Sequence, residues 1–113
     1  MDRVNEYPAI IKRLLTERER IALTSLPLGL EVSCFFDDKT QHYALLSLGW
    51  MKSSRVSSAT LLLRIKDDKI WIEEDKTDAP IAFDLVEEGV SSENIVLGFY
   101  SPEDRSYTDY AVS

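Results

Sequence analysis

The sequence predicts an α+β fold: a single domain, residues 1–113, in which an antiparallel β-sheet of about four or five strands carries two helices on one face. Three patterns support this prediction. Apolar residues recur with a helical period from about Asn5 to Ala22. Apolar and polar residues alternate along several segments between 30 and 74, as in half-buried strands. A second, shorter helical pattern lies near residues 80–88.

The N-terminal helix should begin near Asn5, because Asn is a good N-cap and Pro8 is tolerated only in the first turn. Its apolar face is expected to pack on the sheet, while the charged run 17–20 is expected to lie in solvent. A connector follows, since Pro27 and Gly29 interrupt the helical period.

Two strands are predicted on either side of a turn at 37–40. Every second residue from Leu30 to Phe36 is apolar, so one face of the first strand should be buried. On that face, Cys34 is expected to be a reduced, buried thiol rather than a nucleophile. The second strand, 42–50, is apolar on both faces, which favours a place inside the sheet.

The clearest pattern is a β-hairpin over residues 60–74, joined to the previous strand by a connector at 51–58. A two-residue loop, Asp67-Asp68, sorts its side chains onto two faces, and a slip of one residue would destroy this sorting. The predicted cross-strand pairs are Leu63 with Ile72 and Ile65 with Ile70 on the apolar face, and Arg64 with Trp71 on the other.

The second helix can be capped by Asp75 or Asp78, and Gly89 suits a left-handed C-cap at its end. Residues 95–99 are predicted to form a short buried strand. The segment 101–104 places a Ser, a Pro and two carboxylates as the start of a short helix requires.

The charge balance disfavours autonomous binding to nucleic acid. The chain carries 20 acidic and 13 basic residues, a net charge of −7, which opposes phosphate neutralisation. Basic partners suit it better, although an acidic surface also serves solubility. The N-terminus lacks an apolar signal core, no segment is apolar enough for a membrane span, and a single cysteine cannot form an internal disulfide. We therefore expect a cytoplasmic protein without membrane contact.

Catalytic chemistry has little support in the sequence. His42 is the only histidine, the acidic pairs lie mostly at predicted turns, and the four glycines are scattered singly. We therefore predict no enzyme activity, no catalytic residues, no metal ligands and no cofactor. The rival interpretation is a metal-dependent enzyme acting on nucleic acid or phosphoesters, which would require several carboxylates to converge.

The second face of the hairpin is the candidate contact site for a partner protein. It gathers Leu62, Arg64 and Trp71, and Trp and Arg are the residue types most enriched at interface hot spots. If the helices cover only the aliphatic face, this patch stays open to solvent. The alternative is that helices or another strand cover it. Arg105 could pair with a carboxylate inside the fold or bind an anion of the partner.

Several spaced blocks of this sequence resemble the XisI proteins, excision controlling factors of the fdxN element in cyanobacteria. The similarity runs nearly end to end. The blocks that carry it are His42-Tyr43, Leu48-Gly49-Trp50, Lys69-Ile70-Trp71-Ile72, Ile81-Ala82, Leu85-Val86, Gly89-Val90, Ile95-Val96-Leu97-Gly98-Phe99, Pro102, Arg105, Tyr107-Thr108 and Ala111-Val112. The chain departs from the family pattern where Leu62 replaces a common His and Asp68 a common Gly.

The resemblance implies a small accessory protein for developmentally timed excision of a DNA element in heterocyst differentiation, with a separate recombinase performing the reaction. It also implies a partner, an XisH-like protein similar to endonuclease-fold proteins, beside which a homo-oligomer is a second option. An inhibitor or antitoxin-like mate of that partner is a further alternative. The family carries no established catalytic residues to transfer to this chain.

Overall fold

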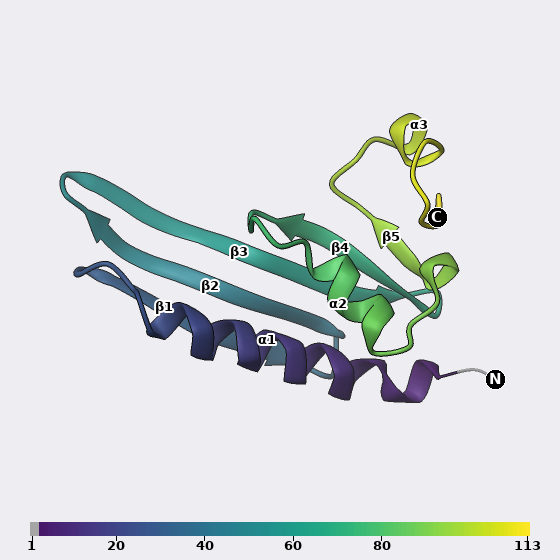
Figure 1. Cartoon of the computed structure of the whole chain (residues 1–113), viewed down its shortest axis with the longest axis horizontal. Helices are drawn as coiled ribbons and strands as arrows, with labels where there is room; N and C mark the ends of the chain where they lie inside the picture. The colour runs from purple at the N-terminus through teal and green to yellow at the C-terminus, as the bar shows by residue number, and fades with distance from the viewer. Residues whose placement is uncertain (1–2) are drawn as a thin grey trace.

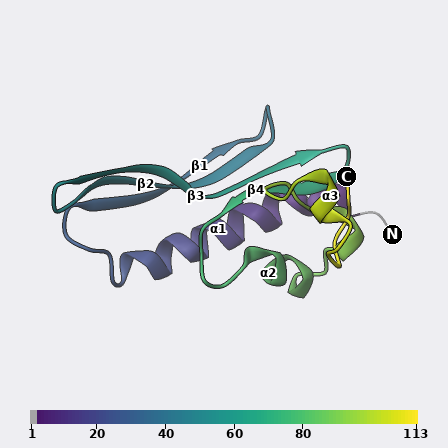
Figure 2. The same ribbon diagram turned by 90° about the horizontal axis from the view of Figure 1, so that it is seen from above.

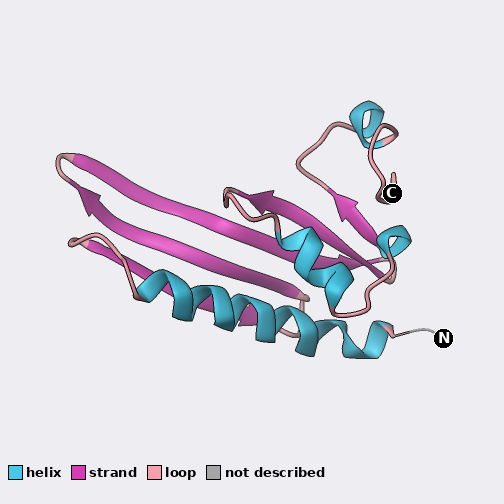
Figure 3. Cartoon of the chain, viewed as in Figure 1, coloured by secondary structure: helices cyan, strands magenta, loops and turns pink. Residues whose placement is uncertain are grey.

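A five-stranded sheet with two helices packed on one face forms the centre of the molecule, which confirms the predicted α+β class (Figures 1 and 3). The computed structural model describes residues 3–113. Its elements follow in this order: η1 Val4–Glu6, α1 Tyr7–Leu23, β1 Leu30–Asp37, β2 His42–Met51, β3 Ser54–Lys66, β4 Lys69–Asp75, α2 Ile81–Glu87, η2 Ser92–Asn94, β5 Ile95–Leu97 and α3 Pro102–Arg105.

The strands lie in the order β1-β2-β3-β4-β5, and the first four form the predicted antiparallel meander. The sheet differs from the wholly antiparallel expectation in its last strand, because β5 pairs with β4 in parallel. The chain leaves β4, passes through α2 and η2, and enters β5 from the same end of the sheet. A connection of this kind, rather than a tight hairpin, is what a parallel pair requires.

The β3–β4 hairpin has the predicted register, with Leu63 opposite Ile72, Arg64 opposite Trp71 and Ile65 opposite Ile70. Its two-residue loop is confirmed. Asp67 and Asp68 have φ angles of 54° and 63°, so both loop residues are left-handed, as a type I′ turn demands.

The predicted connector at 51–58 is wrong, because β3 begins at Ser54 and only Lys52 and Ser53 turn the chain. From Ser54 to Ala59, β3 pairs with β2 alone, since β4 joins it only from Leu61 onward. This half of the β2–β3 hairpin projects beyond the end of α1 (Figure 1). A strand that extends away from the helices needs no buried apolar face, so its sequence shows no alternation.

The core lies between the sheet and the two helices, which occupy the same side of it (Figure 2). Ile11 and Leu15 of α1 and Leu85 of α2 pack against Leu61 and Leu63 of the central strand, and all five are fully buried. Each contributes about 1.5–3 kcal/mol to folding. Among residues 3–113, no helix has the length and apolar character to cross a membrane.

Side chains cap the N-termini of α2 and α3, whereas α1 has no side-chain cap and the predicted Asn5 cap is wrong. The Oδ2 atom of Asp75 accepts a 2.8 Å hydrogen bond from the backbone N–H of Ile81, so Asp75 is the predicted cap of α2. Gly89 has the expected left-handed φ of 98° after that helix. At α3, Ser101 Oγ accepts a bond from the N–H of Asp104. The α1 helix begins at Tyr7, after a 3₁₀ turn, and Pro8 lies in its first turn as predicted.

Candidate partner-contact site

Trp71 lies at the centre of the predicted contact site, on the sheet face opposite the two helices. Its side chain points away from the core because its neighbours Ile70 and Ile72 point into it. The sequence left two alternatives for this indole, open to solvent or covered, and the structure shows it covered, since Trp71 is only 8% exposed. The cations that lie over it come from the neighbouring strand β3 and from α3.

The cover consists of three cations. The distances to the centroid of the indole ring are 5.6 Å from Arg64 Cζ, 4.9 Å from Lys66 Nζ and 5.2 Å from Arg105 Cζ. Long basic side chains can lay their apolar stems on a ring while their charges stay in water. Each cation over the ring contributes about 0.5–1 kcal/mol at an exposed site. We call Arg64, Lys66, Arg105 and Trp71 the cation cluster.

The three cations differ in what else they bind. Arg64 forms an ion pair with Glu73 on β4. Arg105 donates to the backbone carbonyls of Tyr100 and Val112, so neither predicted alternative, an internal carboxylate or a partner's anion, is shown for it. Lys66 is exposed, and its ammonium has no ion pair or hydrogen bond within residues 3–113. The cluster therefore carries more positive than negative charge, on a chain whose net charge is −7.

The prediction from the sequence missed Lys66, although Leu62, Arg64 and Lys66 share one face by simple alternation along β3. Leu62 is half-buried, and a bulge between Leu62 and Leu63 places it opposite Glu74. Beneath the cations, the Nε1–H of Trp71 is buried and finds no hydrogen-bond partner among the residues that the structure describes. An unpaired buried donor costs about 1–3 kcal/mol, so burial of this N–H lowers the stability of the fold.

Carboxylates do not converge elsewhere in a way that suggests metal chemistry. Within residues 3–113, no group of three His, Cys, Asp or Glu side chains is placed to hold a metal ion. His42 is exposed, and its Nδ1 lies 3.1 Å from Thr40 Oγ1 in the β1–β2 turn. The acidic pair Asp37 and Asp38 binds Thr40, Lys12 and Tyr43 instead of facing a cleft.

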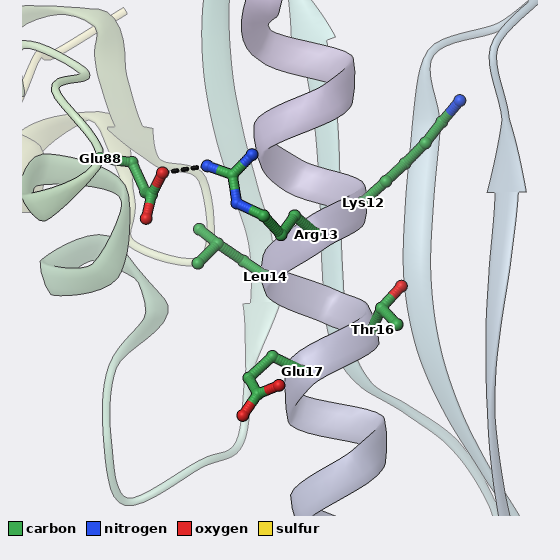
Figure 4. A pocket seen from close by; sticks show the side chains of 6 residues that line it. All are labelled: Lys12, Arg13, Leu14, Thr16, Glu17 and Glu88. Carbon is green, nitrogen blue, oxygen red and sulfur yellow. Dashed lines mark hydrogen bonds and ion pairs between the residues drawn. The ribbon is translucent and has the colours of Figure 1, made fainter.

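A hollow of about 510 Å³ lies beside α1 (Figure 4). Its polar side chains do not converge on a common point: Arg13 turns toward Glu88, with which it forms an ion pair, while Lys12 points to the other side of the helix (Figure 4). Lys12 is paired with Asp38. We assign no chemistry to this hollow.

Cys34 is half-buried on β1 rather than fully buried. Burial, and secondarily the nearby charge of Glu19, raises the pKa of its thiol to about 11. The reactive species in alkylation is the thiolate, which is scarce at such a pKa. These surroundings suit an inert thiol and not a nucleophile.

Alkylation by iodoacetamide at pH 8 should therefore be about 100-fold slower for native Cys34 than in urea, because the pKa lies two units above its ordinary value of 9.0. Stopped time points analysed by mass spectrometry give both rates. Glu19→Gln should speed the native reaction, since it removes a charge that disfavours the thiolate. Equal rates in native and unfolded protein would contradict this account.

Comparison with known proteins places the whole fold in a known group. The family model described as XisI protein matches residues 1–112. The crystal structure of a XisI-like protein from Anabaena variabilis is 35% identical, with a TM-score of 0.86 over 98% of this chain and 100% of that one. The fdxN element excision controlling factor XisI from the same organism is 31% identical, with a TM-score of 0.83 over 99% of this chain and 100% of that one. No curated protein matches the chain.

Proposed function

The chain belongs to the XisI family, and on this basis we propose that it is an accessory controlling factor for site-specific excision of an fdxN-type DNA element. It acts through protein partners rather than by catalysis of its own. The match of the family over residues 1–112 is the observation that carries the proposal. The net charge of −7 supports the second part, because it opposes direct binding to a DNA backbone.

We further propose that the partner is an XisH-like protein of the endonuclease fold, and that the cation cluster with Leu62 forms part of the contact. Trp71 would act there as a platform that aligns the cations, since it is itself covered. Lys66 is the most available of the three, because it has no competing ion pair within residues 3–113. A carboxylate of the partner could form a charge-assisted hydrogen bond with it.

Reversal of this charge gives the test. Lys66→Glu should lower the melting temperature by only a few degrees, because it forfeits one cation–ring contact of about 0.5–1 kcal/mol. It should weaken retention of a co-expressed XisH-like protein about tenfold, or ~1.4 kcal/mol. Lys52→Glu in the β2–β3 turn is the matched control and should bind normally.

Excision itself can be measured by amplification across the rejoined DNA in a deletion strain that carries each variant. Wild type and Lys52→Glu should restore excision, whereas Lys66→Glu should restore less. Absence of any complex with the XisH-like protein at micromolar concentrations would contradict the proposed partner. Excision at the normal level in the deletion strain would contradict the proposed role.

A further inference from the structure

A pocket of about 370 Å³ opens between α2 and the C-terminal segment, apart from the cation cluster. Its lining is dominated by aromatic rings, one from α2 and the others from the segment that follows β5: Phe83, Phe99, Tyr100, Tyr107 and Tyr110. The volume lies at the lower end of the range of small-molecule and side-chain sites, which is ~300–1,000 Å³.

The rings remain unusually open to solvent for such large side chains. Tyr107 of the C-terminal segment is 88% exposed, and Phe83 of α2 is 63% exposed. Phe99 and Tyr100 stack in a tilted pair, with ring centroids 4.8 Å apart. Exposed apolar surface gathered around one concavity is a feature of binding sites, whereas scattered exposed residues are not.

Two carboxylates line the pocket, and only one of them is engaged in the fold. Both oxygens of Asp75 accept hydrogen bonds, from Thr77 and from the N–H of Ile81. Asp109 is exposed and has no hydrogen bond or ion pair within residues 3–113. Burial of the phenol, and secondarily the charge of Asp109, raises the pKa of Tyr110. The pocket thus combines aromatic faces with a free negative charge.

We propose that this pocket binds an arginine side chain from a basic segment of a partner protein. A guanidinium can stack on aromatic faces and at the same time form a bidentate pair with a carboxylate, so it satisfies both features of the lining. An apolar side chain would leave Asp109 unpaired, and an anion would be repelled by it. The net charge of −7 draws a basic segment toward the molecule. This site goes beyond the proposed function, since it does not depend on the identity of the partner.

The probe is the blocked peptide acetyl-Gly-Arg-Gly-amide, and its control is the same peptide with citrulline, a neutral isostere of arginine. Titration of ¹⁵N-labelled protein should shift the amide signals of Phe83, Tyr107 and Asp109. Citrulline should bind at least about fivefold more weakly, because it lacks the charge. Asp109→Asn should reduce arginine binding to the citrulline level. Glu103→Gln removes a charge from the same segment outside the pocket and should have no effect.

Several results would overturn the assignment. Equal shifts with citrulline would make the pocket merely apolar. Equal shifts with acetyl-Gly-Lys-Gly-amide, used as a second control, would make it a general cation site. Absence of saturation, or shifts that map elsewhere, would remove the site altogether. Dilution-dependent shifts of the same amides without peptide would assign the pocket to a second copy of the chain. None of these readouts involves an XisH-like protein or excision, so this proposal can fail independently of the proposed function.

Discussion

Replacement of Trp71 by alanine should lower the free energy of unfolding by about 3–5 kcal/mol, the usual cost of removing a large buried ring. Trp71 is 8% exposed and supports Arg64, Lys66 and Arg105, so the variant leaves a cavity beneath three like charges. Urea denaturation followed by circular dichroism measures the change directly.

Trp50→Ala is the matched control. Trp50 also lies beneath an arginine, with Arg55 Cζ 5.6 Å from its ring, but it is 52% exposed near the far end of the β2–β3 hairpin. Loss of this ring should cost less than about 1 kcal/mol, since a single cation over an exposed ring contributes little. If both variants were equally mild, the indole of Trp71 would be open in solution, which is the first of the two alternatives drawn from the sequence.

Gly49→Ala should destabilise the protein by about 3 kcal/mol or more, because two independent penalties act at one position. Gly49 has a φ of 136°, a conformation that residues with a Cβ rarely adopt. A Cβ there would lie 2.0 Å from the carbonyl oxygen of Gly29, which already accepts a hydrogen bond from the N–H of Trp50. Backbone atoms hold this contact, so no side chain can move aside. Thermal unfolding monitored by calorimetry gives the difference.

Gly98→Ala is the control, because it adds a Cβ at a glycine that does not have a left-handed φ. A Cβ at Gly98 would lie 2.3 Å from Oε1 of Glu73, which belongs to a flexible side chain, and the φ of Gly98 is not left-handed. Glu73 can rotate away at the cost of its pair with Arg64, and the carbonyl oxygen of Ile72, 3.2 Å from that Cβ, needs to move only slightly. The loss should therefore stay at about 1 kcal/mol. A Gly49→Ala variant as stable as Gly98→Ala would show that the β1–β2 ladder can shift there freely.

Local sequence patterns predicted those parts of the fold that local contacts determine. The register of the β3–β4 hairpin follows from its two-residue loop and from the alternation of side chains along its two arms. All of this information lies within 15 consecutive residues, 60–74. The caps at Asp75 and Ser101 are equally local. The direction of β5 was not predictable in this way, because its pairing depends on where α2 returns the chain.

In the candidate site too, local sequence patterns can place some residues, whereas others are brought in from distant segments. Alternation along β3 contains enough information to place Lys66 beside Arg64, but the position of Arg105 over Trp71 joins segments 34 residues apart. No pattern within the hairpin reveals that third cation. The aromatic pocket likewise combines Phe83 of α2 with Tyr107 and Asp109 of the C-terminal segment, so its residues appear unrelated along the chain.

The first half of β3 also bears on how the chain avoids aggregation. The two outer strands of the sheet each have one further contact at their edge: the N–H of Cys34 on β1 donates to Glu19, and Val96 on β5 bridges to Ala111. From Ser54 to Ala59, however, β3 presents unpaired backbone groups to solvent, the usual template for amyloid-like stacking. This stretch is rich in serine and carries Arg55, a composition that forms poor steric zippers. The same polar composition that gives this strand no apolar alternation thus also protects its open edge from stacking with other chains.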